Sequence, residues 1–352
     1  MLHLKSSNFD KFHCIADQCP MSCCHGWQIV IDDESLHRYK NEENSMKERL
    51  EQSIDWEESC FYQKNGRCVM LNDNELCDLQ LTLGEDALCT TCQRYPRHVE
   101  EFEDVREWSL SLSCPEAARI ILENKESLSF IQWDEKEEDD FEDFDFLLYT
   151  NLTDAREILF QIIQDRNISF YIKAYYMLNF AEKMQIYLDD GDFSSMEDLL
   201  SQYRKRLESQ TLFDMNLDIM DQNFICHNSE DIFAKEQFET LFDLEQLNPE
   251  WINLLNITKE NFVYKISFDS KKEIQAEQLL MFFVYTYFCG AVYDNMIYAK
   301  VLFAISCVYW IFQVENSCFM EADSIIKASY LFAREIEHSD DNLNTLEAYF
   351  DL

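Results

Sequence analysis

The sequence LLMFFVYTYFCGAVY, residues 279–293, carries no charged side chain, and VLFAISCVYWIFQV, residues 301–314, is apolar again. Each run is shorter than the ~20 residues that a helix needs to span a bilayer. We therefore expect two buried helices in the core of a soluble protein. Apolar residues also recur at helical spacing outside these runs, for example over residues 158–163.

The rest of the composition favours helices as well. The chain has 352 residues but only 5 glycines and 4 prolines, the two residues that most often interrupt helices. We expect a mostly α protein, with further helices at 195–207, 276–287, 296–312 and 323–337. The glycines are isolated, so the Gly-rich turn of a dinucleotide-binding fold is missing and a non-Rossmann scaffold is expected.

The chain is strongly acidic, with a formal net charge of −39. No basic surface exists to neutralise phosphates, so we expect no nucleic-acid partner and no binding to an anionic membrane. The acidic field either keeps the protein soluble or attracts a cationic partner such as a lysine side chain. The first eight residues resemble no secretory signal, so a reducing cytoplasmic location is expected.

Ten of the fourteen cysteines lie within the first 114 residues. One cluster reads Cys14-x4-Cys19-x3-Cys23-Cys24, and a second reads Cys68-x8-Cys77-x11-Cys89-x2-Cys92, with Cys114 after it. In a reducing compartment such clusters hold metal more often than disulfides, and we expect these nine thiols to supply the ligands. Disulfides and plainly buried thiols are the alternatives.

The spacing favours an iron–sulfur cluster, of the 4Fe-4S type, over zinc. Zinc sites commonly take paired Cys-x2-Cys units, and only Cys89 and Cys92 have that spacing. An iron–sulfur cluster accepts thiolates from scattered loops. The spacing does not decide which four thiols are ligands. A single nucleophilic cysteine served by His25 or His98 is a further alternative.

We expect a loop-rich, cysteine-rich module at residues 1–133, an acidic linker at 134–149 and a larger helical domain at 150–352, on which the module packs. Within the module we expect a strand at 27–31 and a helix at 33–50. A helix should also start near Cys114, with Ser113 and Glu116 at capping-box spacing. The helix dipole would then favour the thiolate of Cys114.

Three stretches together carry a family resemblance. They are SCCHGW at residues 22–27, LCTTCQRYPR at 88–97 followed by SLSCPEAAR at 111–119, and FAREIEHSDDNL at 332–343. In this order they resemble the flagellin lysine-N-methylase family. The resemblance covers both ends of the chain, and the middle is matched only in its helical character.

The resemblance implies methyl transfer from S-adenosyl-L-methionine to lysine side chains of flagellin or another lysine-bearing protein, with an N-terminal iron–sulfur cluster. The cluster would be structural or would anchor the cofactor, since polar methyl transfer has no redox need. Relatives with similar clusters are described only as zinc- or iron-chelating. A non-enzymatic metal- or cluster-binding protein, in iron handling or redox sensing, therefore stays as the alternative.

Catalytic residues are expected in the C-terminal motif. On a helix, Arg334, Glu337 and His338 share one face. Glu337 or His338 would be a base or substrate anchor, and Arg334 would hold a carboxylate such as that of the cofactor. The alternative is a salt-bridge set within the last helix.

Cofactor-binding residues are expected in the two N-terminal motifs. They are Tyr95, Arg97 and Trp27. Arg97 could clamp an anion bidentately, or it could instead pair with Glu100 or Glu101. Trp27 could cap the cysteine site or contact the substrate.

Overall fold

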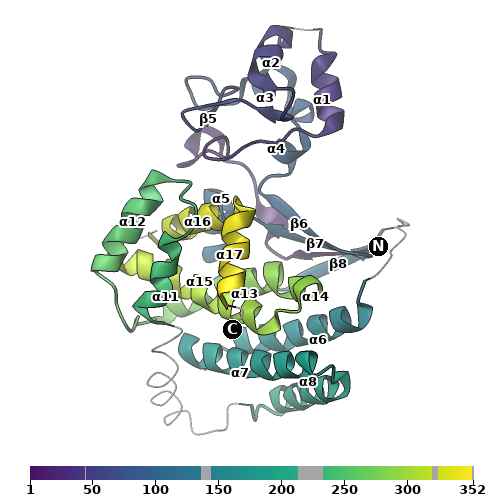
Figure 1. The fold of residues 1–352 in the computed structure, drawn as a ribbon, viewed down its shortest axis with the longest axis vertical. Coiled ribbons are helices and arrows are strands. Elements are labelled where there is room, and N and C mark those ends of the chain that lie inside the picture. Colours follow the sequence, from purple (N-terminus) through teal and green to yellow (C-terminus); the bar gives the residue numbers. More distant parts are fainter. Residues whose placement is uncertain (44, 136–143, 213–232, 319–323, 351–352) are drawn as a thin grey trace.

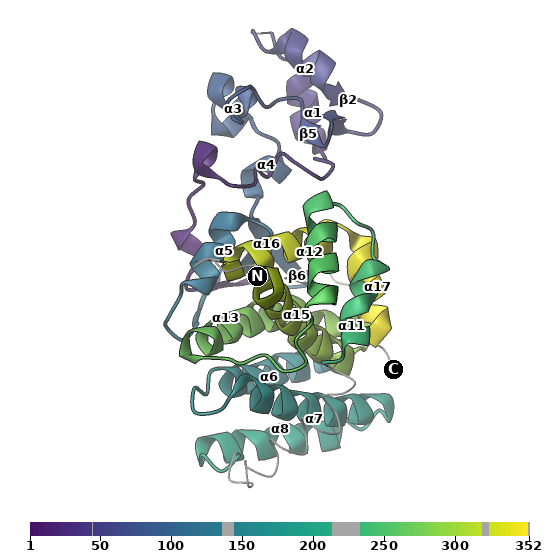
Figure 2. The ribbon, with the colours of Figure 1, turned by 90° about the vertical axis from the view of Figure 1, so that its left-hand side faces the viewer.

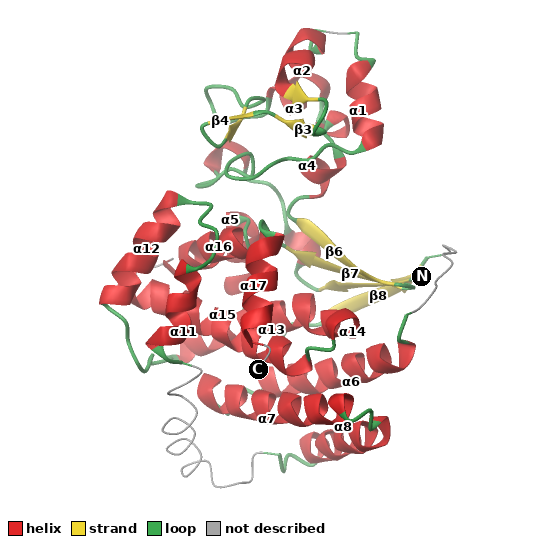
Figure 3. Ribbon diagram, viewed as in Figure 1, coloured by secondary structure: helices red, strands yellow, loops and turns green. Residues whose placement is uncertain are grey.

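The computed structural model describes residues 1–352 except 44, 136–143, 213–232, 319–323 and 351–352. Helices dominate it, as Figure 3 shows, so the expected mostly α, non-Rossmann fold is confirmed. The helices of the body are α6 (Phe146–Ile163), α7 (Phe170–Asp189), α8 (Phe193–Glu208), α11 (Lys235–Glu239), α12 (Pro249–Glu260), α13 (Ser270–Tyr287), α14 (Ala291–Asp294), α15 (Ile297–Cys318), α16 (Ser324–Glu337) and α17 (Asp340–Phe350).

Helix α15 forms the centre of the body. It packs against α7, α12, α13, α16 and α17, and Figure 1 shows these helices around it. Its Tyr309 and Trp310 are fully buried. Among the described helices it is the one long and apolar enough to cross a membrane, but 94% of its apolar window is buried inside the protein. This is the burial of a core helix, and the two apolar runs of the sequence are accordingly the buried helices α13 and α15.

A four-stranded sheet lies beside the helices. Its strand order is β6 (Arg97–Phe102), β7 (Val105–Leu110), β1 (Leu2–Ser6), β8 (Phe130–Asp134), and β1 runs parallel to β7 and antiparallel to β8. The buried pair Arg156–Glu107 joins α6 to β7 through two hydrogen bonds of 2.5 Å. The sheet is therefore fixed to the helical body.

The cysteine-rich segment forms a small lobe above the body (Figure 2). Its elements are α1 (Asp33–Lys40), α2 (Lys47–Ser53), β2 (Ile54–Asp55), β3 (Cys60–Phe61), β4 (Gln63–Lys64), β5 (Arg67–Cys68), α3 (Asp78–Leu83) and α4 (Thr90–Arg94). The lobe has an apolar core of its own, which includes Leu50, Ile54 and Leu79. Helix α5 (Pro115–Leu122) packs instead against α13 and α16 of the body.

The expected domain boundaries stay predictions, and half of the acidic linker, residues 136–143, lies outside the described residues. The apolar core itself divides at a different place. Phe102, Val105, Leu112 and Ile121 belong to the same core as the body helices. The sheet and α5 thus extend the body, and the separate core is confined to the lobe.

Three local expectations were wrong. Residues 27–31 make only an isolated bridge between Val30 and Cys60 instead of a strand. The helix expected at 33–50 is broken after Lys40, where the Asn41 side chain donates to the carbonyl of His37 and competes with the helical pattern. Cys114 is the N-cap of α5 as expected, but no side chain caps this helix, because Glu116 binds Arg119.

Candidate functional site

Two cavities meet at one pair of rings, those of Trp27 and His338. Cavity A, of about 500 Å³, lies between residues 16–27, residues 247–249 and helix α16. Cavity B, of about 720 Å³, lies between residues 91–98, strand β7, helix α13 and the end of α16. Both side chains line both cavities, and their rings stand edge to face with centroids 3.3 Å apart. The N-terminal and C-terminal motifs therefore meet in space.

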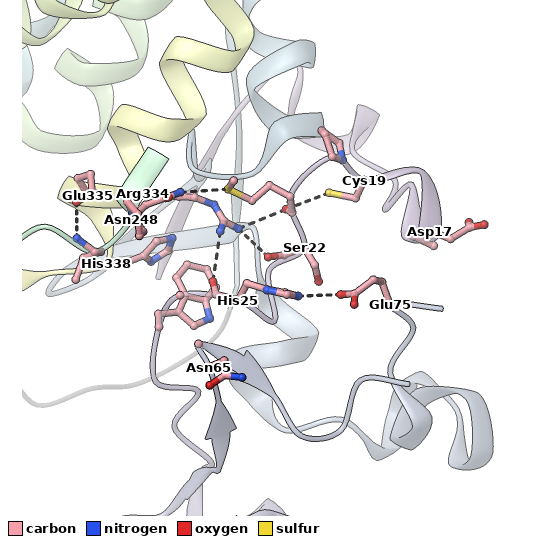
Figure 4. Close-up of a pocket in the computed structure, with 18 residues that line it drawn as sticks. Asp17, Cys19, Ser22, His25, Asn65, Glu75, Asn248, Arg334, Glu335 and His338 are labelled. Atoms are coloured by element: carbon pink, nitrogen blue, oxygen red, sulfur yellow. Dashed lines mark hydrogen bonds and ion pairs between the residues drawn. The ribbon is translucent and has the colours of Figure 1, made fainter. Parts of the chain in front are cut away.

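Arg334 joins α16 to the cysteine-bearing loop. Its guanidinium donates to the backbone carbonyls of Ser22 at 3.0 Å, His25 at 3.3 Å and Met21 at 3.4 Å, and to that of Ser113 at 3.2 Å. Figure 4 shows the contacts with Ser22 and His25 beside cavity A. The side chain is buried, and these carbonyls occupy its donors. The contacts make Arg334 a positioning residue, and an additional role as anchor of a cofactor carboxylate stays a prediction.

Glu337 binds a different N-terminal segment, the loop between β7 and α5. Its carboxylate accepts hydrogen bonds from the Ser111 hydroxyl and from the backbone N–H groups of Leu112 and Ser113. Burial raises the pKa of Glu337, while the hydrogen bonds from Ser111 and Ser113 act in the opposite direction. Arg334 and Glu337 thus bind two loops of the N-terminal third, and this geometry does not support a salt-bridge set closed within α16.

His338 is held neutral. Burial, and the nearby Arg334 guanidinium, lower the pKa of its imidazole to about 2. Its Nε2 atom is buried and has no hydrogen-bond partner among the described residues. With the proton on Nδ1, Nε2 is an acceptor that can orient an N–H group but is a weak base.

Glu335, the residue after Arg334, belongs to the group that the C-terminal motif singles out, but no sequence pattern assigns it a role of its own. It is 1% exposed and lines cavity A. The backbone N–H of Leu247 donates to its Oε2 at 2.7 Å, whereas its buried Oε1 has no partner among the described residues. Burial raises the pKa of this carboxyl to about 7. The helical spacing that selected Arg334, Glu337 and His338 points away from Glu335, and its burial could not be read from the sequence.

The three expected cofactor-binding residues, Trp27, Tyr95 and Arg97, all line cavity B. The rings of Trp27 and Tyr95 stand edge to face at 4.8 Å. Arg97 lies over the ring of Phe12 at 5.2 Å. The two acids considered as its partners bind elsewhere, Glu100 to His98 at 2.6 Å and Glu101 to Arg106 at 3.0 Å. The structure thus brings the three residues together at one cavity.

The clustered thiols fall into two sets. In the lobe core, Cys68 and Cys89 are buried and Cys24, Cys77 and Cys92 pack against it. Cys114 belongs to a separate apolar cluster at the start of α5, and the electrostatic neighbours of its thiol are Cys19 and Cys14. Cys23 is a neighbour of Cys14 and Cys114 and also hydrogen-bonds the Cys24 thiol, so the adjacent pair connects the two sets.

The donor chemistry of these sets suits a thiolate-bound metal, but an assembled ligand group is not present. The thirteen described cysteines are all free. No group of three or more His, Cys, Asp or Glu side chains in the described part of the chain is placed to hold a metal ion. The Cys23 hydrogen bond lowers the pKa of Cys24 to about 7. Burial raises the pKa of the Cys114 thiol to about 11, so it outweighs the expected effect of the helix dipole.

The C-terminal part of the chain matches a known family. The family described as the FliB lysine N-methylase C-terminal domain matches residues 156–351, more than half of the chain. The chain belongs to this family. The lysine N-methylase match includes Arg334, Glu335, Glu337 and His338, while the clustered cysteines precede it.

Individual relatives agree with the family. A lysine-N-methylase of Salmonella typhimurium is 29% identical over 128 residues, which cover 34% of this chain and 32% of that protein. The flagellar biosynthetic protein FliU of Salmonella muenchen is 29% identical over 127 residues, which cover 34% of this chain and 75% of that protein. The matched segment thus spans about a third of the Salmonella typhimurium lysine-N-methylase. No solved structure matches this chain.

Proposed function

We propose that this protein is a cytoplasmic, S-adenosylmethionine-dependent lysine N-methyltransferase that acts on flagellin or another lysine-bearing protein. Membership of the lysine N-methylase family supports the reaction class. The observation that carries the proposal is the meeting of two cavities at Trp27 and His338. A methyl donor and an amine need two binding spaces that share one point, where the reacting atoms are aligned.

Cavity B suits the cofactor. Its volume of about 720 Å³ is within the usual range for a cofactor-sized ligand. Trp27 and Tyr95 offer aromatic surface for a purine, and Arg94 and Arg97 offer guanidinium groups for a carboxylate. When bound there, S-adenosylmethionine supplies a methyl group already activated on a sulfonium.

The chain's own residues then align the amine. The neutral imidazole of His338 can accept a hydrogen bond from the amine at Nε2 without adding a positive charge beside the sulfonium. Glu337 and Arg334 hold the two loops that carry Tyr95's partner Ser113 and the wall residue Trp27. Replacing either residue should therefore disturb the alignment of both cavities.

We further propose that the clustered thiols hold an iron–sulfur cluster of the 4Fe-4S type, with zinc as the less favoured metal. The candidates are Cys14, Cys19, Cys23 and Cys114 in one set and Cys24, Cys68, Cys77, Cys89 and Cys92 in the other. What supports this is the donor chemistry, and ligation would draw the thiols closer than they lie here. Its role would be structural or cofactor-anchoring, and no methyl-transfer step passes through it.

The test is methyl transfer itself. Anaerobically purified protein is incubated with unmodified flagellin, with and without S-adenosylmethionine, and the flagellin is analysed by intact mass and peptide mapping. Cofactor-dependent mass gains in methyl steps, mapped to lysine, are expected. No gain from protein with a full metal content would contradict the enzyme and favour the non-enzymatic cluster-binding alternative, which the thiol clustering supports.

A further inference from the structure

Cavity A contains two buried acceptors without partners. Glu335 is 1% exposed, and its Oε2 accepts from the Leu247 N–H while its Oε1 has no partner in the described part of the chain. The same holds for Nε2 of His338, which also lines the cavity. Buried polar atoms are normally hydrogen-bonded, because leaving one unpaired costs free energy. Two such atoms on one cavity wall indicate that a donor from a ligand completes the site.

The charge of cavity A favours a cationic donor. Besides Glu335, the carboxylate of Asp17 lines it, whereas the Glu75 carboxylate on the same wall already binds Arg67 at 2.9 Å and His25 at 2.8 Å. The guanidinium of Arg334 also reaches the wall, but its N–H groups donate to four backbone carbonyls. A carboxylate and a neutral imidazole nitrogen are both acceptors, so the matching group is a primary amine or ammonium.

Cavity B has guanidinium groups in its lining, together with three carboxylates. Arg94 and Arg97 line it, and neither lines cavity A. A ligand with an anionic end and an aromatic base fits B, whereas an aliphatic amine fits A. The two spaces meet at Trp27 and His338, so an amine nitrogen in A and a methyl group in B would face each other there.

We propose that cavity A receives the substrate's lysine side chain and that Glu335 is the residue that binds its amino group. This inference rests on the proposed function. It adds the cavity through which the lysine side chain enters and a residue that determines specificity for it. The ammonium donates to Oε1 of Glu335, and a second N–H donates to Nε2 of His338.

The same carboxylate can take the proton that must leave before transfer. The proton passes from the ammonium to Oε1 of Glu335, and the freed nitrogen lone pair forms the bond to the methyl carbon. The carbon–sulfur bond breaks, and the sulfur keeps its electron pair. Burial and the nearby Glu245 raise the pKa of Glu335 to about 7, against the lowering effect of the Leu247 and Asn248 N–H groups and of Arg334. His338, with a pKa of about 2, is a far weaker acceptor for the proton of a lysine ammonium, whose pKa is ~10.4 in free lysine.

The test compares Glu335→Gln with Asp17→Asn, which removes an exposed carboxylate from the same cavity. Equilibrium binding of a lysine-containing flagellin peptide is measured without cofactor, and S-adenosylmethionine binding is measured separately. We expect Glu335→Gln to weaken peptide binding by about tenfold or more, the loss of a charge-assisted hydrogen bond. Cofactor affinity should be unchanged, Asp17→Asn should change peptide binding by less than about threefold because its charge is screened, and Glu335→Asp should restore part of the binding.

Unchanged peptide affinity in Glu335→Gln would overturn the inference, as would a loss of cofactor affinity instead, because cavity A would then hold the cofactor. If the variant does not fold, wild-type protein is tested with a peptide that carries norleucine in place of lysine, and equal binding of both peptides overturns the inference. Because peptide binding needs no turnover, the two proposals fail separately. Peptide binding that depends on Glu335, without methyl transfer, would contradict only the proposed enzymatic activity. Methyl transfer that does not depend on Glu335 would contradict only the role of Glu335 in binding the lysine.

Discussion

The indole of Trp27 and the imidazole of His338 come from opposite ends of the chain, and their rings meet edge to face with centroids 3.3 Å apart. This contact lies at the junction of cavities A and B, because both side chains line both cavities. The guanidinium of Arg334 lies 5.7 Å from the Trp27 ring and fixes the loop that carries it. The relative position of the two cavities therefore depends on a few side chains of α16.

Trp27→Ala should widen the junction of the two cavities and misalign the reactants. We expect kcat for methyl transfer to fall by about 100-fold, the scale of a displacement near 1 Å at a reacting centre. Trp27→Phe keeps an aromatic wall and should retain most of the rate. Equal rates for the two variants, measured at saturating substrates, would contradict the role of the wall.

Arg97→Gln should weaken cofactor binding and leave peptide binding unchanged. The guanidinium is the group that we assign to the cofactor's carboxylate, so the Kd for S-adenosylmethionine should rise by about tenfold. Peptide binding should not change, since Arg97 lines only cavity B. Arg94→Gln, on the same cavity, shows whether either guanidinium alone is enough to bind the cofactor's carboxylate. A normal cofactor Kd in both variants would show that neither guanidinium binds the cofactor's carboxylate.

Arg334→Lys should destabilise the protein although it keeps the charge. A lysine cannot reach four carbonyls with a planar fork, so buried acceptors lose their partners and about 2–4 kcal/mol of unfolding free energy is lost. Arg119→Lys is the matched control, because its partners Glu116 and Glu123 form a partly exposed set worth less than about 1 kcal/mol. Denaturant unfolding of both variants measures the difference, and equal midpoints would contradict the positioning role.

Glu335 should make stability fall as the pH rises. Its pKa is about 7 in the folded protein and about 4.3 when unfolded, so between these values the folded state holds the extra proton. The free energy of unfolding therefore decreases from about pH 4 to about pH 7, by up to about 3 kcal/mol from this group. Glu335→Gln has no titrating carboxyl at this position, so its free energy of unfolding should not show this decrease. Its Tm relative to wild type should therefore rise between pH 5 and pH 8. A Tm difference that is constant with pH would show that the carboxyl is not perturbed.

Cys92→Ala should lower the iron and acid-labile sulfide content and bleach visible absorbance. Cys92 packs against the lobe core beside Cys89 and belongs to the larger thiol set. Cys318→Ala, in helix α15 far along the chain, is the control and should keep its iron. Full iron content in Cys92→Ala would remove Cys92 from the ligand set.

Periodic features of the sequence predicted the body of the fold well. The helices expected at 195–207, 276–287 and 296–312 lie within or close to α8, α13 and α15. Helix α8 buries one apolar face with helical spacing, whereas α13 and α15 are apolar runs buried on all sides. The sheet was not predicted, since β1 pairs with β7 and β8, about a hundred residues away, and such pairing leaves no local pattern. The lobe was predicted poorly, because short elements there depend on tertiary contacts instead of propensity.

The site was predicted in part. The motifs pointed to Trp27, Tyr95, Arg97 and His338, which line one cavity, while their roles there stay predictions. The specific roles of Arg334 and Glu337 could not be read from helical spacing, since their partners are backbone groups of distant loops. Glu335 was given no role for the same reason, because its significance lies in a buried oxygen that has no partner within the described residues.

The most direct test of the central claim, that cofactor and lysine occupy separate cavities joined at Trp27 and His338, is two-substrate steady-state kinetics. Initial rates of flagellin methylation are measured while S-adenosylmethionine and flagellin are both varied. Separate cavities predict a ternary complex, and hence double-reciprocal lines that intersect. Parallel lines would show that the methyl group first moves onto the protein and that one ligand leaves before the other binds, which would contradict the two-cavity account.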